Sequence, residues 1–401
     1  MWKKVIETIG TRYLVAFLNL LLIFVNARAL GRSGTGLAGM IYASANIALV
    51  FSGILCGNTI VYFMNRYHFR YVLWPAYVWA FTGPAVACGA MTLAGMTPAG
   101  YGMEVYALTV LLSLVTVHSR ILLGKDRIRA FNATFMLQGG LLFFILLYIY
   151  NVLGWRDARG YLCGLFAVNG IAWAVSLALL VPLFRQKAED DDRRPASTAR
   201  LVREMFAYGL WGSVDSLAEN LTTRLNYFLV RWAGGYGQVG LLDAGTRIAE
   251  SVWHVSRSAS FISYSEVAKA ADPEVQRRTT LRFFKLTCGA TALMMLAIWF
   301  LPERIYTDFL FTAEFRGIRR VIRGLAAGVV AFGGNSILGH YFIGTGRVKY
   351  SAACSCIGLL VLLIAGYVLI PAAGVLGAAV STSIAFTAML TFSLSVFIRM
   401  T

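Results

Sequence analysis

Apolar stretches of about 20 residues alternate with short polar breaks along the whole chain. A helix of about this length satisfies its own backbone hydrogen bonds and crosses the hydrocarbon core of a bilayer. The pattern therefore predicts an all-α polytopic membrane protein with about twelve transmembrane helices. We place the spans at 9–29, 37–63, 71–94, 103–123, 130–150, 160–184, 204–231, 237–263, 281–301, 319–343, 349–370 and 374–398.

One long polar stretch divides these spans six to six. Residues 185–203 read RQKAEDDDRRPASTARLVR and are expected to form an exposed cytoplasmic linker. This division predicts an N-terminal six-helix lobe at 1–184 and a C-terminal six-helix lobe at 204–401.

Short motifs recur in the same order in the two halves. Gly36-Leu37 and Gly240-Leu241 open the second and eighth spans, GKDR at 124–127 and GTGR at 344–347 close the fourth and tenth, and GYLCG at 160–164 and GVLG at 374–377 open the sixth and twelfth. Both repeats begin on the same side of the membrane. We therefore expect two pseudo-symmetric lobes around a central cavity, an arrangement typical of transporters.

The charge balance sets the orientation. The 401 residues carry a formal charge of +17, but only 14% are charged, against about a quarter in soluble proteins. The loops on the side of the N-terminus hold more than twice as many Lys and Arg as the opposite loops, which predicts that both termini are cytoplasmic. We assign the excess to anionic lipid headgroups and expect no nucleic-acid partner. A cluster at Arg316–Arg323 is the exception to this orientation.

A charged stripe marks the eighth span. Its members follow one another at intervals of four, three, four and three residues and so share one helix face: Asp243, Arg247, Glu250, His254 and Arg257. A charge at the bilayer centre costs about 2.5–3.5 kcal/mol on insertion scales, so the stripe should face other helices or water. A self-neutralised ladder of ion pairs and a helix lying on the membrane surface are the alternatives. If this helix lay on the surface, the five cationic residues between 269 and 285 would fall on the outer side, against the charge rule that sets the orientation.

The first and seventh spans also carry polar faces. Arg12, Asn19 and Asn26 lie seven residues apart on one stripe, where hydrogen bonding between helices, or snorkelling of the arginine, is the alternative to binding. In the seventh span only one of two opposite faces can line a cavity, and Arg224 lies deeper than Arg231. One face holds Asp215, Glu219, Thr222 and Asn226, and the other holds Asn220, Arg224, Tyr227 and Arg231.

These residue types suit an anionic ligand and a coupling cation. A guanidinium such as Arg247 or Arg257 offers bidentate donors to phosphate and keeps its charge when desolvated. Four acids are candidate coupling sites for H⁺ or Na⁺: Asp215, Glu219, Asp243 and Glu250. The motifs GxSxG, HExxH and GxxxxGK[ST] do not occur, and we expect neither an enzyme nor a bound cofactor or metal.

Several motifs together resemble a known family along nearly the whole chain. They are RALG at 28–31 with GTG at 34–36, RLNYF at 224–228, Val239-Gly240 with Ala244 and Arg247, GTGR at 344–347, and PAAGVLGAA at 371–379. The chain is similar in these positions to the polysaccharide flippases of the multidrug/oligosaccharidyl-lipid/polysaccharide exporter superfamily. Asp243 departs from the family pattern, in which this position holds an uncharged residue.

The resemblance implies alternating access through a V-shaped cavity walled partly by the first, seventh and eighth helices. It also implies a bacterial inner-membrane flippase for an undecaprenyl-diphosphate-linked oligosaccharide. Such a protein is expected to be a monomer in contact with membrane lipids, with association with polysaccharide assembly proteins left open. Substrate-binding candidates on this view are Arg12, Asn19, Asn26, Arg224, Arg247, His254 and Arg257. A cation-coupled drug exporter of the same fold is the main alternative, and a membrane enzyme acting on glycans or acyl groups is a third.

Overall fold

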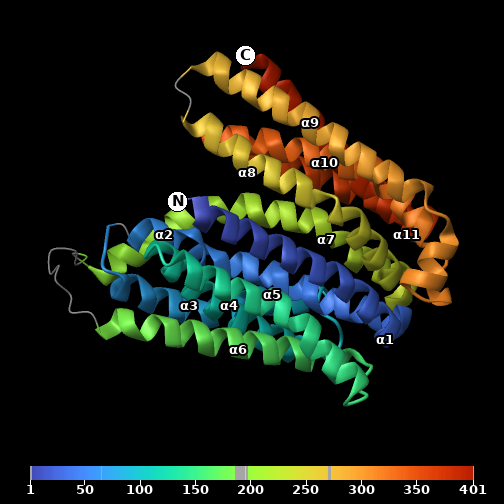
Figure 1. Ribbon diagram of the computed structural model, residues 1–401, viewed down its shortest axis with the longest axis horizontal. Coiled ribbons are helices and arrows are strands. Elements are labelled where there is room, and N and C mark those ends of the chain that lie inside the picture. Colours follow the sequence, from blue (N-terminus) through green and yellow to red (C-terminus); the bar gives the residue numbers. More distant parts are fainter. Residues whose placement is uncertain (1, 65, 186–194, 196, 270–271, 401) are drawn as a thin grey trace. The chain divides into compact units, whose positions relative to one another are not determined.

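The computed structural model describes residues 2–64, 66–185, 195, 197–269 and 272–400, and in this part of the chain helices are joined by short connections and no strand occurs (Figure 1). Most of the expected linker, 186–194 and 196, lies outside the described residues. Helix α7 begins at Thr198, so the end of the stretch expected as linker is helical.

Three long helices turn sharply at a single glycine. The backbone is non-helical at Gly31 in α1, Gly235 in α7 and Gly374 in α11, each with a positive φ that suits only glycine well. When each is divided there, and the short α2 and α8 are counted as continuations of the second arms of α1 and α7, the described elements correspond to the twelve expected spans. The helices are α1 (Trp2–Cys56), α2 (Asn58–Met64), α3 (Phe69–Leu93), α4 (Gly102–Gly124), α5 (Ile128–Asn151), α6 (Ala158–Arg185), α7 (Thr198–Ser251), α8 (Trp253–Lys269), α9 (Pro273–Phe300), α10 (Ile318–Gly344) and α11 (Val348–Arg399).

Eight of the described helices are long and apolar enough to cross a membrane. Helix α7 lies outside this set and holds charged residues of the seventh and eighth spans, which lower its hydropathy, whereas α8, with 17 residues, is too short for the set. The chain is an all-α, multi-pass membrane protein, as the sequence predicted.

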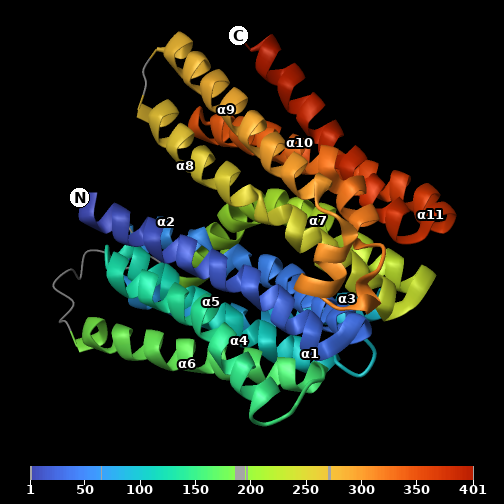
Figure 2. The same ribbon diagram turned by 45° about the vertical axis from the view of Figure 1, so that its right-hand side comes forward.

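The two arms of α11 run antiparallel (Figure 2). The hydroxyl of Ser393 donates to Sγ of Cys354 over 3.2 Å, and a Cβ on Gly358 would lie 2.5 Å from Sδ of Met389. These pairs are nearly symmetric about Gly374. One glycine therefore reverses the chain without a separate loop.

The contacts divide the chain into two compact units. Unit 1 comprises Met1–Val25 and Met40–Leu217, and unit 2 comprises Asn26–Gly39 and Ala218–Thr401. The segment around the first kink thus belongs with the second half of the sequence. The division at 185–203 into two six-helix lobes stays a prediction about spans.

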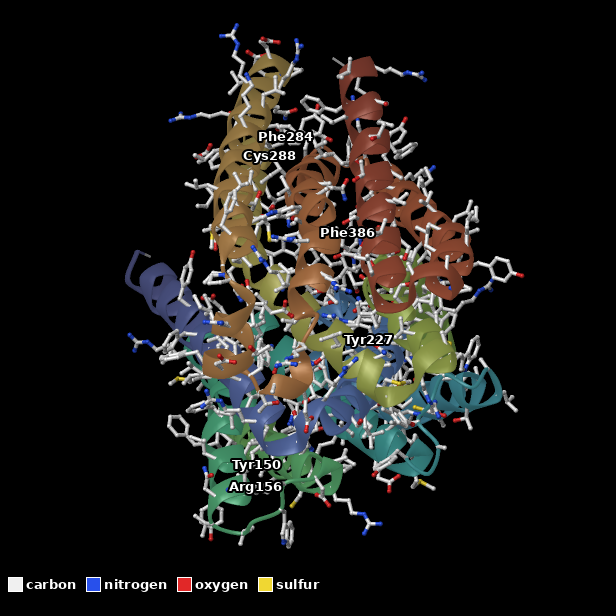
Figure 3. All side chains as sticks on the ribbon, turned by 90° about the vertical axis from the view of Figure 1, so that its right-hand side faces the viewer. Tyr150, Arg156, Tyr227, Phe284, Cys288 and Phe386 are labelled. Carbon is white, nitrogen blue, oxygen red and sulfur yellow. The ribbon has the colours of Figure 1, made fainter. Side chains whose placement is uncertain are left out.

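Helix α4 is at the centre of unit 1. It contacts α2, α3, α5 and α6. Buried apolar side chains of α2, α3 and α4 pack with the first turns of α7, where Tyr208 stacks on Tyr62 with ring centroids 4.2 Å apart. At the end of α5, Arg156 donates to the carbonyl oxygen of Tyr150 over 3.1 Å (Figure 3).

Helix α10 is at the centre of unit 2, where it contacts α8, α9 and α11. Glycines bring these helices close. A Cβ on Gly334 would lie 2.8 Å from both Sγ of Cys288 and the ring of Phe284, two α9 residues marked in Figure 3. On the α11 side, a Cβ on Gly328 would lie 2.4 Å from the Cα of Ser383. Small residues at helix crossings are the usual means of tight packing in membranes.

The repeated GKDR and GTGR motifs form the same turn. Arg127 N donates to Leu122 O in the first, and Arg347 N donates to Phe342 O in the second. The third residue of each motif has a positive φ, 54° at Asp126 and 74° at Gly346. The sequence repeat is therefore a structural repeat at this point.

Candidate functional site

Two glycine-rich segments of unit 2 cross in backbone contact. A Cβ on Gly36 would lie 1.9 Å from Tyr236 O, and a Cβ on Gly240 would lie 1.9 Å from Arg32 O. Both segments follow kinks of nearly the same geometry, with ψ −175° at Gly31 and at Gly235. No side chain larger than hydrogen fits at Gly36 or Gly240. The crossing therefore sets how closely the eighth span approaches the second.

The side chain of Arg32 adds hydrogen bonds across the same crossing. Its Nε donates to Gly237 O over 2.7 Å, and its Nη2 donates to Oε1 of Gln238 over 2.8 Å. Its backbone N–H donates to a carboxylate oxygen of Glu314, in the connection before α10, over 2.8 Å. Polar contacts thus hold the segment Asn26–Gly39 to the rest of unit 2.

A chain of charge-assisted hydrogen bonds links the two arms of α7. Arg224 donates to Oε2 of Glu250 over 2.7 Å and to the hydroxyl of Tyr227 over 2.9 Å. That hydroxyl donates to Oδ1 of Asp243 over 3.0 Å. Arg247 Nε donates to both oxygens of the Asp243 carboxylate, over 2.9 and 2.8 Å. We call these five residues the α7 network.

The α7 network lies at membrane depth. Tyr227 and Asp243 each stand eight residues from Gly235, which corresponds to about 12 Å along a helix, and the hydrocarbon core is about 30 Å thick. The two arginines offset the two carboxylates, so the network has no formal net charge. This pairing lowers the cost of keeping four charges in a low-dielectric region.

The network is open on one side. The side chains of Arg224 and Arg247 are 26% and 31% exposed, whereas that of Asp243 is 4% exposed. Tyr227 is also buried (Figure 3). The guanidinium groups are therefore accessible to a ligand. The buried Asp243 carboxylate and the Tyr227 hydroxyl fix their positions by hydrogen bonds.

The opposite face of the seventh span packs against α11. The side-chain amide of Asn226 donates to Ala378 O over 2.9 Å and to the hydroxyl of Thr382 over 2.8 Å. Thr222 is buried, and its methyl would lie 3.5 Å from a Cβ on Gly358. This answers a question that the sequence left open: the Arg224 face turns to the eighth span, and the Asn226 face is a packing surface.

The expected charged stripe is interrupted at Val252, between α7 and α8. Val252 N donates to Ala249 O, and Val255 N donates to Val252 O, which tightens the helix there. The break accompanies burial of Trp253, whose indole N–H donates to Val329 O over 3.0 Å. His254 and Arg257 follow on α8 with exposed side chains. The helix is therefore not continuous along the expected stripe, and the shared face of the five residues stays a prediction.

The remaining candidates are dispersed. Arg12 lies in α1, but its side chain is outside the described residues. Asn19 is exposed in unit 1, and Asn26 is half-buried in unit 2. Asp215 and Glu219 are half-buried on the first arm of α7, the former in unit 1 and the latter in unit 2.

Sequence reasoning did not select Tyr227 as a site residue, although it joins the two ion pairs. The only signal was its position three residues after Arg224 on the same face. Among the described residues, no group of three His, Cys, Asp or Glu side chains could hold a metal ion.

Comparison with solved structures gives matches along almost the whole chain. An inward-facing multidrug resistance MATE family transporter of the MOP superfamily has a TM-score of 0.71 at 14% identity, covering 96% of this chain and 94% of that one. The lipid II flippase MurJ, in an inward closed conformation, also has a TM-score of 0.71, at 13% identity, covering 99% and 87%. The chain has the fold of the MOP superfamily transporters.

A third match concerns binding-pocket polarity. It is a MOP superfamily transporter from Pyrococcus furiosus whose structure is described as having a reversed polarity of its binding pocket, with a TM-score of 0.57 at 15% identity and coverage of 98% and 93%. No family model and no curated protein matches the sequence. The fold expected from the motif resemblance is confirmed, and at these identities the likeness concerns the fold alone.

Proposed function

We propose that the protein is a bacterial inner-membrane flippase that moves a polyprenyl-diphosphate-linked oligosaccharide from the cytoplasmic to the outer leaflet. The observation that carries this proposal is the α7 network, which offers two guanidinium groups at membrane depth, each with part of its surface open. Guanidinium groups bind phosphate oxygens in pairs and stay charged when desolvated. The likeness to a lipid II flippase is in keeping with such a substrate.

The carboxylates supply the coupling in this proposal. Asp243 and Glu250 hold the arginines while the site is empty of substrate. Protonation of either acid removes its negative charge, so a guanidinium becomes available to the diphosphate. Proton binding and diphosphate binding therefore favour each other, and release of the proton on the far side returns the arginine to its carboxylate.

The other candidate residues keep their proposed roles. Arg257 and His254 on α8, and Arg12, Asn19 and Asn26 on α1, remain candidates for substrate binding. Asp215 and Glu219 are further coupling candidates. The six-helix lobes at 1–184 and 204–401, cytoplasmic termini and alternating access belong to the same proposal.

A proton-coupled exporter of small cationic molecules is the second candidate. The pairing of each arginine with an acid favours it, since the network is not uniformly cationic. A MATE family transporter is among the structural matches.

Reconstituted vesicles separate the two functions. The purified protein is inserted with a fluorescent, short-chain oligosaccharide on a polyprenyl diphosphate, and a membrane-impermeant glycosidase reports the glycan's leaflet. The flippase proposal predicts protein-dependent equilibration with the lipid chemically unchanged. Proton-driven efflux of a cationic dye without glycan movement would replace it with the exporter, and chemical conversion of the lipid would indicate an enzyme.

A further inference from the structure

A long groove runs along the second arm of α11 in unit 2. Its volume is about 760 Å³, and its walls come from α10 and from both arms of α11, with apolar side chains such as Ala327, Ile357 and Phe392. The α7 network does not use it. We call it the α11 groove.

Along one edge of the α11 groove, a short hydroxyl side chain occurs at every fourth residue of one helix face, and the series ends in an arginine. Its members are Ser383, Thr387, Thr391, Ser395 and Arg399. These short side chains make the depression, because a larger residue at each turn would fill it.

The hydroxyl groups of this series all donate to backbone carbonyl oxygens, that of Ser383 to Gly324 O of α10 over 2.6 Å and the others to α11 itself. Thr387 donates to Ser383 O over 2.8 Å, Thr391 to Thr387 O over 2.9 Å, and Ser395 to Thr391 O over 2.8 Å. Since an unsatisfied donor against hydrocarbon would be costly, this back-bonding lets the edge meet an apolar chain. Along its length the groove therefore behaves as an apolar surface.

The end of the groove is suited to an anion. Arg399 is exposed, and within the described residues no carboxylate lies at ion-pair distance from it. A second guanidinium stands at the same end, where Arg347 contacts Sδ of Met400 over 3.0 Å. An apolar trough that ends in two arginines matches a lipid with a phosphate at the end of its chain.

The length of the groove selects among such lipids. Ser383 and Arg399 are sixteen residues apart, which is about 24 Å of helix. The hydrocarbon of one leaflet is about 15 Å thick, half of the bilayer core. An ordinary two-chain phospholipid would fill only part of the groove, whereas a single long isoprenoid chain can follow it past the midplane.

We propose that the α11 groove binds the isoprenoid chain of a polyprenyl phosphate or diphosphate, with the phosphate beside Arg399 and Arg347. This inference rests on the proposed function and deepens it by giving the tail of the transported lipid a site of its own. The phosphate first binds beside Arg399 and Arg347, and the headgroup then moves to the α7 network while the tail stays in this groove at the protein surface. The phosphate end lies at the C-terminus of α11, which is the expected cytoplasmic side, where the substrate would load.

Native mass spectrometry of the full-length protein tests this assignment. The probe is a polyprenyl monophosphate without any glycan, and phosphatidylglycerol, an anionic lipid with two acyl chains, is the competitor. The wild type is expected to retain the polyprenyl lipid about tenfold better than the competitor, and Thr391→Trp and Arg399→Gln should each lose about tenfold. Far-ultraviolet circular dichroism checks that the variants are helical.

Two controls match these substitutions. Ile364→Trp adds the same ring at an exposed position on the first arm of α11, and Arg282→Gln removes an exposed arginine from α9. Both should bind within about twofold of wild type. Equal binding by Thr391→Trp, Arg399→Gln and the controls would overturn the groove assignment and leave the flippase proposal standing. Equal retention of phosphatidylglycerol would reduce the groove to a site for ordinary bilayer lipid. Failure of the wild type to retain any polyprenyl lipid would count against both proposals.

Discussion

The hydroxyl of Tyr227 donates a hydrogen bond of 3.0 Å to Asp243, and the two residues stand eight positions on either side of Gly235. Because the same hydroxyl accepts from Arg224, one phenol joins the Arg224–Glu250 pair, which bridges the two arms of α7, to the Asp243–Arg247 pair on the second arm. The hairpin at Gly235 is therefore closed by a polar contact at membrane depth as well as by packing.

Removing that hydroxyl should loosen the hairpin. Tyr227→Phe leaves one guanidinium N–H and one carboxylate oxygen without this partner in a buried setting, which should destabilise the protein by about 1.5–3 kcal/mol. Thermal unfolding in detergent measures the change. Tyr236→Phe is the control, since Tyr236 offers its ring to Arg231, with the guanidinium carbon 4.9 Å from the ring centre. Equal losses in the two variants would show that the Tyr227 hydroxyl has no special role.

The Arg224–Glu250 pair should behave as a coupled unit. Glu250→Gln and Arg224→Gln each leave one charge without its partner, so the double substitution should cost less than the sum of the single ones. We expect a coupling energy of about 0.5–3 kcal/mol from a double-mutant cycle on unfolding free energies. Additive costs would mean that the 2.7 Å contact contributes nothing to stability.

The glycine crossing admits no side chain. Gly240→Ala places a Cβ 1.9 Å from the carbonyl oxygen of Arg32, and relief of that overlap requires the helices to separate. A cost of about 1–3 kcal/mol or more is expected in thermal unfolding. Gly53→Ala is the matched control inside α1, where no atom lies within 4 Å of the new Cβ, and it should be neutral or slightly stabilising. A neutral Gly240→Ala would contradict the close crossing.

Substitutions at equivalent positions of the duplicated turn should change the stability of the protein in opposite directions. Asp126 holds a positive φ of 54°, which costs an L-residue about 1–2 kcal/mol, so Asp126→Gly should stabilise the protein by part of that amount. Gly346→Ala introduces the same penalty at the equivalent position and should destabilise it by about 1 kcal/mol. Melting temperatures of the two variants should move in opposite directions, and a shift in the same direction would argue against equivalent turns.

The pattern of apolar stretches was sufficient to locate the membrane spans but not to predict how consecutive spans are connected. Twelve apolar stretches could be located because each has to cross a membrane of fixed thickness. The gaps between the predicted spans, 30–36 and 232–236, indicated short loops. In the structure one left-handed glycine reverses the chain while its neighbours remain helical. Composition signals a break, but the backbone conformation at a single residue decides how long it is.

The polar site was only partly predictable for a similar reason. Helical spacing is a local property, and it located Asp243 and Arg247 as a pair four residues apart. The partner of Arg224 is Glu250, 26 residues away, and that pairing depends on how the hairpin closes. The break at Val252 lies beside Trp253, whose indole N–H donates to Val329 O of α10, and helical spacing does not reveal a contact of this kind between distant segments.

The central claim is that the lipid diphosphate replaces carboxylates at Arg224 and Arg247. Calorimetric titration with the lipid-linked oligosaccharide in two buffers of different ionisation enthalpy counts the protons bound with the substrate. The account predicts proton uptake on binding, tighter binding as the pH falls, and loss of the uptake with retained binding in the Asp243→Asn, Glu250→Gln double variant. Substrate binding without proton uptake in the wild type, or at wild-type affinity in an Arg224→Gln, Arg247→Gln double variant, would contradict it.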